Sequence, residues 1–183
     1  MSQSSGGAGT GYVNGGRTKH LGLEAAVHLE LLRPSENQFG VTLESNATFV
    51  DATYSSDRHI VKSGIRHNIN GRRLPYAPSW HFSHTVNIAT PFGVSLHATL
   101  TQVTRQYADE LNTVTPTADG LIGEIPGTTM LDLTARYSLP ALHSSFVLSV
   151  KNATDARVIV SRRPSGIKVS LPRFVTAGVE LSL

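Results

Sequence analysis

The sequence predicts an all-β fold, specifically an antiparallel transmembrane β-barrel segment of about seven strands that forms only part of a barrel. Three observations support this class. Apolar and polar residues alternate with a period of two along seven segments. The links between these segments are alternately short and long, as in outer-membrane barrels. No run of 18 apolar residues is present that would form a membrane-spanning helix.

The first four segments are residues 20–31, 39–49, 80–88 and 94–101. In the first, apolar side chains from Leu21 to Leu31 occupy the odd positions, and polar ones such as Glu24 and His28 lie among the even positions. The next three have the apolar faces Phe39, Val41, Leu43, Ala47 and Phe49; Trp80, Phe82, Val86 and Ile88; and Val94, Leu96, Ala98 and Leu100. Each is therefore a two-faced strand.

The last three segments are residues 129–137, 145–151 and 175–183. Their apolar faces are Thr129, Leu131, Leu133, Ala135 and Tyr137; Phe146, Leu148 and Val150; and Val175, Ala177, Val179, Leu181 and Leu183. The opposite faces include Asp132, Thr134 and Arg136; Ser145, Ser149 and Lys151; and Thr176, Gly178, Glu180 and Ser182. We expect seven strands and no helix.

The connections support a membrane barrel. Residues 32–38, 89–93 and 138–144 form short links, whereas residues 54–79, 108–127 and 153–173 are long and rich in Gly, Pro, Asn and charge. Outer-membrane barrels have short periplasmic turns and long extracellular loops. We therefore place the three short links on the periplasmic side and the three long ones outside.

A soluble β-sandwich is the main alternative, because its strands alternate in the same way. The apolar faces here include many small residues, whereas a sandwich core needs bulk: Ala25, Ala47, Ala98, Ala135 and Ala177. Charged residues stand in mid-strand on the opposite faces, which suits a wet lumen: Glu24, Glu44, Asp132, Arg136 and Glu180. A small porin-like barrel ranks third, since such barrels have an even number of strands.

Composition excludes several function classes. The 183 residues contain no Cys, so disulfides, thiolate metal sites and a cysteine nucleophile are absent. The net charge of +3 is mild and the basic residues do not cluster as in a nucleic-acid-binding arm. His81 and His97 share the polar face of neighbouring strands, but their spacing matches no ligand motif. We expect no enzyme, metal site, cofactor or nucleic-acid partner.

Residues 1–19 are Ser/Gly-rich and lack the basic and apolar regions of a signal peptide. We interpret them as the remnant of an extracellular loop, followed by the barrel strands of residues 20–183. We expect the export signal to lie outside this chain.

Four motifs, in order, resemble those of TonB-dependent outer-membrane receptors, and the nearest likeness is to receptors for ferric dicitrate and similar chelates. They are YVNGGRTKHLGLEA at 12–25, GRRLPYAPSWHFS at 71–83, YADELNT with GLIGEIPGTTMLDLTARYSL at 107–139, and VKNATDARVIV with PRFVTAGVELSL between 150 and 183. Two positions depart from the family pattern. Residues 152–155 read Asn-Ala-Thr-Asp where the family has Asn-Leu-Phe-Asp, and Leu183 replaces a terminal aromatic.

The resemblance implies a Gram-negative outer-membrane receptor that imports iron chelates such as ferric citrate or siderophores. Family barrels have 22 strands and an N-terminal plug that contacts TonB. This chain has about seven strands and no plug, so we expect the C-terminal part of a barrel, from a truncated gene product or a partial gene model. It would be incomplete for energised transport. Its expected partners are membrane lipid, lipopolysaccharide and the barrel-assembly machinery, with TonB reached only through the absent plug.

Loop charge gives candidate ligand-binding residues. The first long loop and the last each hold five bases against one acid, whereas residues 108–127 hold four acids and no base. Basic loops attract an anionic ferric chelate by steering and charge-assisted hydrogen bonds. The candidates are Arg58, Arg66, Arg72, Arg73, Arg162 and Arg163. The alternative is that these arginines contact lipopolysaccharide phosphates or only solvent.

Overall fold

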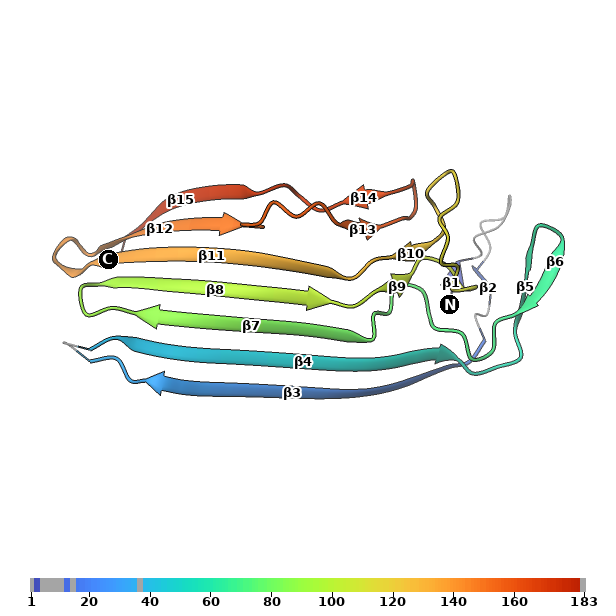
Figure 1. Cartoon of the computed structure of the whole chain (residues 1–183), viewed down its shortest axis with the longest axis horizontal. Helices are drawn as coiled ribbons and strands as arrows, with labels where there is room; N and C mark the ends of the chain where they lie inside the picture. The colour runs from blue at the N-terminus through green and yellow to red at the C-terminus, as the bar shows by residue number, and fades with distance from the viewer. Residues whose placement is uncertain (1, 4–11, 14–15, 36–37, 182–183) are drawn as a thin grey trace.

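The computed structural model describes residues 2–3, 12–13, 16–35 and 38–181, and its main feature is one antiparallel seven-stranded sheet (Figure 1). The strands are β3 (Thr18–Leu32), β4 (Gly40–Tyr54), β7 (Trp80–Ala89), β8 (Val94–Val103), β11 (Thr128–Leu139), β12 (Ser144–Lys151) and β15 (Phe174–Leu181). Their order, β15-β12-β11-β8-β7-β4-β3, is a meander in which each strand pairs with its neighbours along the chain. The seven predicted strands are confirmed.

In the described residues, shorter elements lie before β3 and in the connections between the long strands. Four two-stranded sheets are formed by β1 (Ser2–Gln3) with β2 (Tyr12–Val13), β5 (His59–Lys62) with β6 (Ile65–Asn68), β9 (Gln106–Tyr107) with β10 (Glu124–Ile125), and β13 (Ile159–Ser161) with β14 (Lys168–Val169). One turn of 3-10 helix, η1 (Pro140–Leu142), occupies a short link. The sequence did not predict these elements because each is too short to show a period.

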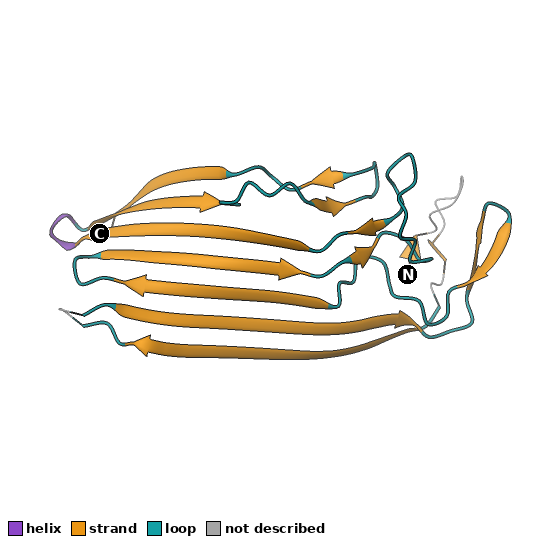
Figure 2. Ribbon diagram, viewed as in Figure 1, coloured by secondary structure: helices purple, strands orange, loops and turns teal. Residues whose placement is uncertain are grey.

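The two ends of the sheet differ as predicted. Figure 2 shows tight turns at one end of the long strands and the extended connections, with their small hairpins, at the other. The strand pairing gives the three short links to one end and residues 55–79, 104–127 and 152–173 to the other. We name these three segments the first, second and third loop.

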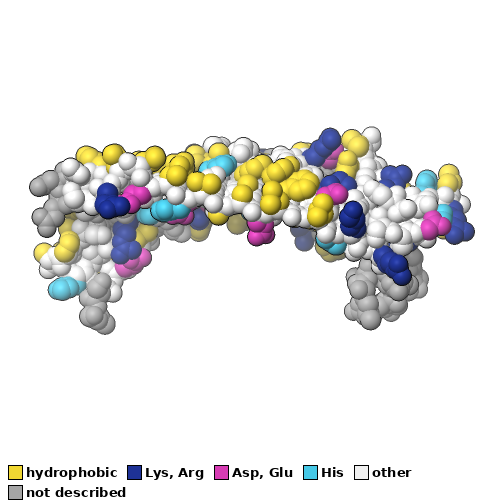
Figure 3. Space-filling model, turned by 90° about the horizontal axis from the view of Figure 1, so that it is seen from below, with side chains coloured by type: hydrophobic (Ala, Val, Ile, Leu, Met, Phe, Trp, Pro, Cys, Tyr) yellow, Lys and Arg dark blue, Asp and Glu magenta, His cyan; other side chains and the backbone are white. Residues whose placement is uncertain are grey.

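One face of the sheet is apolar and solvent-accessible. A single cross-strand row consists of Leu29, Leu43, Val86, Ala98, Leu133, Val150 and Val175. Leu23 is 65% exposed and Val175 57% exposed. Hydrophobic side chains gather along one surface of the sheet in Figure 3, with acidic and basic ones mainly elsewhere. An exposed apolar face that crosses all seven strands requires apolar surroundings.

Burial is concentrated at the loop end instead. The buried hydrophobic residues of the described part are Ala52, Tyr54, Ile69, Ala108 and Ile125. All lie in the loops or at the loop end of β4. The alternative β-sandwich is wrong, because among the described residues no second large sheet covers the apolar face. Nor are β3 and β15 paired with each other there, so the described sheet is not a small closed barrel.

Aromatic side chains mark both borders of the apolar face. Phe49 packs on Trp80 near the loop end, with ring centroids 4.8 Å apart. Phe39 meets Phe92 edge to face at the short-turn end, with centroids 6.0 Å apart. Such girdles mark the two membrane interfaces of outer-membrane barrels. No helix in the described residues is long and apolar enough to cross a membrane.

The polar face is cross-linked by hydrogen bonds between strands. Asn87 donates to Thr42 Oγ1 over 3.0 Å and lies 2.5 Å from His97 Nδ1. His28 Nδ1 lies 3.7 Å from Glu44 Oε1. The described residues contain no cluster of three His, Cys, Asp or Glu side chains that could hold a metal ion. His81 lies on the same face as His97 but pairs with Val103, away from this network.

Two expectations fall on residues that the structure does not describe. Leu183, expected on the apolar face, lies outside the described residues, as does most of the segment interpreted as a loop remnant at 1–19. The strand β3 begins at Thr18, within the last two residues of this segment.

Candidate ligand-facing loop cluster

The three loops pack together into one cluster above the sheet, and the second loop lies between the other two. Tyr76 of the first loop donates its backbone N–H to Tyr107 O over 2.9 Å. The hydroxyl of the same tyrosine accepts the N–H of Arg162, in the third loop, at 3.3 Å. One residue therefore joins all three loops.

Arg162 is a buried arginine that binds backbone carbonyls. It is 3% exposed, and its guanidinium donates to Glu124 O from Nε at 3.1 Å and from Nη2 at 3.0 Å, and to Gly120 O from Nη1 at 3.2 Å. Burying a cation is costly unless its donors are satisfied. This side chain therefore fastens the third loop to the second and is not available at the surface for a ligand.

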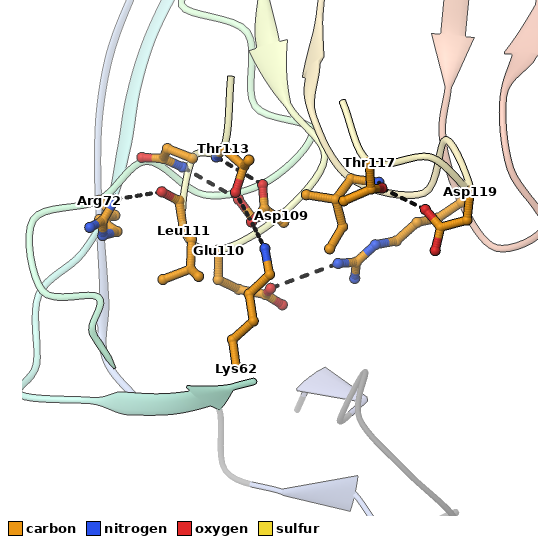
Figure 4. Close-up of polar contacts among 11 residues, drawn as sticks. Lys62, Arg72, Asp109, Glu110, Leu111, Thr113, Thr117 and Asp119 are labelled. Atoms are coloured by element: carbon orange, nitrogen blue, oxygen red, sulfur yellow. Dashed lines mark hydrogen bonds and ion pairs between the residues drawn. The ribbon is translucent and has the colours of Figure 1, made fainter. Parts of the chain in front are cut away.

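Arg72 and Arg73 are also engaged within the protein. Arg72 Nη1 donates to Leu111 O in the second loop (Figure 4). The Arg73 guanidinium lies 3.1 Å from Asp51 Oδ1 and donates to Val50 O at 3.0 Å. The backbone N–H and C=O of Arg73 both bond to the Asn112 side-chain amide, at 2.8 Å each. These contacts join the first loop to the second and to β4.

The acids of the second loop face bases from both neighbours. Lys62 Nζ of the first loop lies 3.9 Å from Asp109 Oδ2, and Arg163 Nη2 of the third lies 3.8 Å from Glu110 Oε2 (Figure 4). Asp109 is 3% exposed, and its carboxylate accepts from the backbone N–H and hydroxyl of Thr113 at 3.0 and 2.7 Å. The basic loops are thus partly neutralised by the acidic loop between them.

Arg58 and Arg66 lie apart from these contacts, in the first loop. With Gly16, Ser56, Asp57, His59 and Val61 they line an open cleft of about 600 Å³. The Arg58 guanidinium lies over the Tyr54 ring, 5.7 Å from its centroid. Arg66 is exposed, and its side chain makes no hydrogen bond or ion pair to the described part of the chain. Of the six predicted arginines, these two share a solvent-open site.

The second loop depends on a close backbone approach. Gly123 has φ of +131°, and a Cβ atom there would lie 2.8 Å from Pro116 Cα. Its carbonyl accepts the N–H of Ala108 at 3.2 Å. Asp119 closes the loop tip by accepting from the Thr117 hydroxyl at 2.5 Å and from Leu121 N–H at 3.0 Å. These hydrogen bonds, the hydroxyl first, hold the pKa of Asp119 below its ordinary value.

The third loop is clamped at its base by Asn152 and Asp155. The Asn152 amide, 3% exposed, donates to Ala156 O and Leu171 O at 3.0 and 2.9 Å and accepts from Ala156 N–H at 2.9 Å. Asp155 Oδ1 accepts the N–H of Arg173 at 2.8 Å, which lowers the pKa of this carboxyl. The polar residues of the Asn-Ala-Thr-Asp segment therefore close the loop.

Sequence reasoning missed the pairing partners of the arginines. The sequence does contain one signal for these partners, namely the opposite charge of the loops. The charged residues among residues 108–127 of the second loop are all acidic, and this loop lies between two basic loops. Charge could suggest Lys62–Asp109 and Arg163–Glu110. Backbone carbonyl acceptors such as Glu124 O leave no mark in the sequence, so the burial of Arg162 was not predictable.

Solved structures with the same fold include two transporters and one receptor. The ferric citrate transporter FecA, unliganded, is 24% identical, with a TM-score of 0.70 over 86% of this chain and 23% of FecA. The siderophore receptor PiuA from Acinetobacter baumannii is 19% identical, with a TM-score of 0.69 over 93% of this chain and 22% of PiuA. The outer membrane transporter YddB from Escherichia coli is 12% identical, with a TM-score of 0.61 over 88% of this chain and 25% of YddB. The chain therefore spans about a quarter of the length of each.

Curated protein sequences give no match to this chain. A family model does match: the one described as TonB dependent receptor-like, beta-barrel covers residues 1–153. This range contains β3 to β12 and the first two loops. It confirms the resemblance inferred from the motifs, and the solved structures share the fold of this chain. The chain belongs to the family of TonB-dependent receptors, within their β-barrel.

Proposed function

We propose that this chain supplies barrel wall and extracellular loops to an outer-membrane receptor that takes up iron chelates such as ferric citrate or a siderophore. The observation that supports this most is the loop cluster, in which three long loops are fastened into one body above a membrane-facing sheet. The names of the structural neighbours, a ferric citrate transporter and a siderophore receptor, support the ligand class.

The sheet works as part of a larger barrel in this proposal. Within the described residues, the outer edges of β3 and β15 have no strand beside them. A bilayer cannot hydrogen-bond exposed backbone groups, so both edges need further strands. The chain then provides binding surface, no enzymatic step and no energy coupling. Coupling to TonB passes through a plug, and assembly through the barrel-assembly machinery, with lipid and lipopolysaccharide around the wall.

The cleft beside Arg66 is the proposed point of contact with the anionic chelate. A guanidinium free to form a charge-assisted, bidentate bond matches a carboxylate of ferric citrate. Arg58 contributes positive charge to the same cleft while it packs on Tyr54. The four other predicted arginines have structural partners, so we assign them to holding the loops.

Ferric citrate binding by the intact receptor tests this proposal. Arg66→Gln should raise the Kd about 5- to 30-fold, as for loss of one charge-assisted contact. Lys168→Gln is the matched control, since it removes one exposed positive charge from the third loop. Equal effects of the two changes on the Kd would mean that Arg66 acts only by long-range electrostatic steering and does not contact the chelate. No effect of Arg66→Gln on any ferric chelate would remove the cleft from the binding site.

A further inference from the structure

The open cleft of the first loop holds its two arginines in different ways. Arg66, on β6, is exposed and lies in register with Val61 of β5. Arg58, just before β5, is half-buried, and its guanidinium lies over the ring of Tyr54, 5.7 Å from the ring centroid. The negative face of an aromatic ring attracts a cation, so Tyr54 restricts the positions that the Arg58 charge can take.

The ring of Tyr54 is a rigid support for this charge. Tyr54 is the last residue of β4 and is 8% exposed. Its backbone N–H donates to Arg72 O, and its C=O accepts the N–H of Gly71, each over 2.9 Å. A side chain buried at the density of a protein interior has little freedom to change its rotamer. The support for Arg58 is therefore fixed to the loop end of a barrel strand.

The backbone of Arg58 is also held in place. Its N–H donates to Ser56 O at 2.8 Å, and its C=O accepts the N–H of the fully buried Ile69 at 2.9 Å. The Ser56 hydroxyl in turn accepts the N–H of Arg17 at 3.1 Å. Arg58 is thus fixed by hydrogen bonds at its backbone and by the Tyr54 ring at its guanidinium.

The aromatic face of Tyr54, and not its hydroxyl, makes the contact with Arg58. Among the residues that the structure describes, the Tyr54 hydroxyl has no hydrogen-bond partner. Phenylalanine has the same ring face without the hydroxyl, whereas leucine has neither. Substitution by these two residues therefore separates the effect of the ring from the effect of the hydroxyl.

We propose that Tyr54 is a positioning residue that presets Arg58, so that the cleft meets two carboxylates of one chelate, one at Arg58 and one at Arg66. Tyr54 has this role only if the proposed function holds, because both take the cleft as the point of contact. An arginine that is already ordered loses little side-chain entropy on binding, whereas exposed Arg66 must be ordered by the ligand. Arg58 therefore supplies charge at a fixed place, and Arg66 adapts to the second carboxylate.

Ferric citrate binding by the intact receptor tests the role of the ring. Tyr54→Leu removes the aromatic face and should raise the Kd about three- to tenfold, as for loss of one cation–π contact. Tyr54→Phe keeps the face and should keep the Kd of the unmodified receptor. Tyr107→Leu is the matched control, since it removes a tyrosine ring from the second loop that does not line the cleft. Equal effects of Tyr54→Leu and either of the other two changes would overturn the proposal.

A double-mutant cycle separates positioning of Arg58 from a general disturbance of the loops. If the ring acts through Arg58, Tyr54→Leu should have no further effect on the Kd in the Arg58→Gln background. In the Arg66→Gln background it should keep its full three- to tenfold effect, about the range of one cation–π contact. A rise of the Kd in both backgrounds would mean that Tyr54 only stabilises the loops, and would overturn its positioning role.

Failure of this role is distinguishable from failure of the proposed function. If Arg66→Gln weakens ferric citrate binding and Arg58→Gln does not, the cleft still binds the chelate but Tyr54 positions nothing for it, which overturns the inference alone. If neither arginine substitution changes the Kd, the cleft does not contact the chelate, and both the proposed contact and the role of Tyr54 are overturned.

Discussion

Arg162 holds the backbone of Glu124, 38 residues away, with two side-chain donors on one carbonyl oxygen, Nε at 3.1 Å and Nη2 at 3.0 Å. The same guanidinium reaches Gly120 O. A charged side chain thus acts as a buried cross-brace between two loops. The loops bury only a few hydrophobic side chains of their own, Ile69, Ala108 and Ile125, and such braces add to this small core.

Replacing Arg162 by Met should loosen the loop cluster while the sheet stays intact. The change removes the donors and leaves the carbonyls of Gly120 and Glu124 unpaired, at a cost of about 2–4 kcal/mol. The rate of protease cleavage within residues 108–127 in intact cells reports this loosening of the loop cluster. Arg157→Gln, which alters an exposed ion pair, is the control. Equal protection in both variants would show that Arg162 does not brace the loops.

The pair Arg163–Glu110 should couple weakly. Its atoms are 3.8 Å apart and its side chains are 31% and 21% exposed. Partly exposed pairs contribute about 0.2–1 kcal/mol and are screened by salt. A double-mutant cycle of Arg163→Gln and Glu110→Gln on loop opening, repeated at high salt, measures the coupling. A salt-independent coupling above about 2 kcal/mol would contradict a solvated bridge.

Asn152→Ala should open the base of the third loop. It leaves Leu171 O and the Ala156 N–H without this partner in a buried setting, while Ala156 O keeps the Ser170 hydroxyl at 2.8 Å, and the loss costs about 2–4 kcal/mol. Amide exchange of Ala156 reports the change directly, since its N–H bonds to Asn152 Oδ1. Ala153→Ser, next in sequence but outside this bond set, should leave that exchange slow.

The clamp at Asp155 should weaken in acid. Its pKa is lowered in the folded loop by the Arg173 N–H, so the carboxylate stabilises the loop above its unfolded pKa near 3.9. That contribution is lost as pH falls through the lower folded value. Exchange of the Arg173 amide, corrected for intrinsic rates, should rise in this window. Asp155→Asn should abolish the pH dependence, and a rise already near pH 6 would implicate another group.

The sheet was predictable because strands repeat with a period of two, and this period also gave the two faces. Alternation fixed Leu43, Val86 and Leu133 on one face without knowledge of their partners. The loop cluster has no period. Arg162 and Arg163 are neighbours with the same charge, yet one is buried on carbonyls and the other meets Glu110. Their roles depend on which loops meet in space, which sequence spacing does not determine.

His84 shows a different limit. Its even position on β7 placed it on the apolar face, but a polar residue there conflicts with the pattern and is easily passed over. The structure supplies what the pattern lacks, namely the hydroxyl of Ser45 on the adjacent strand.

The shared braces of the three loops also bear on receptor engineering. A single loop transplanted from this chain into a related barrel would arrive without the neighbours that hold Arg162, Asn112 and Glu110 in place. The proposed ligand preference should therefore move from one receptor to another only when all three loops are transplanted together. A chimera with a single transplanted loop should have a misfolded loop on a correctly folded barrel.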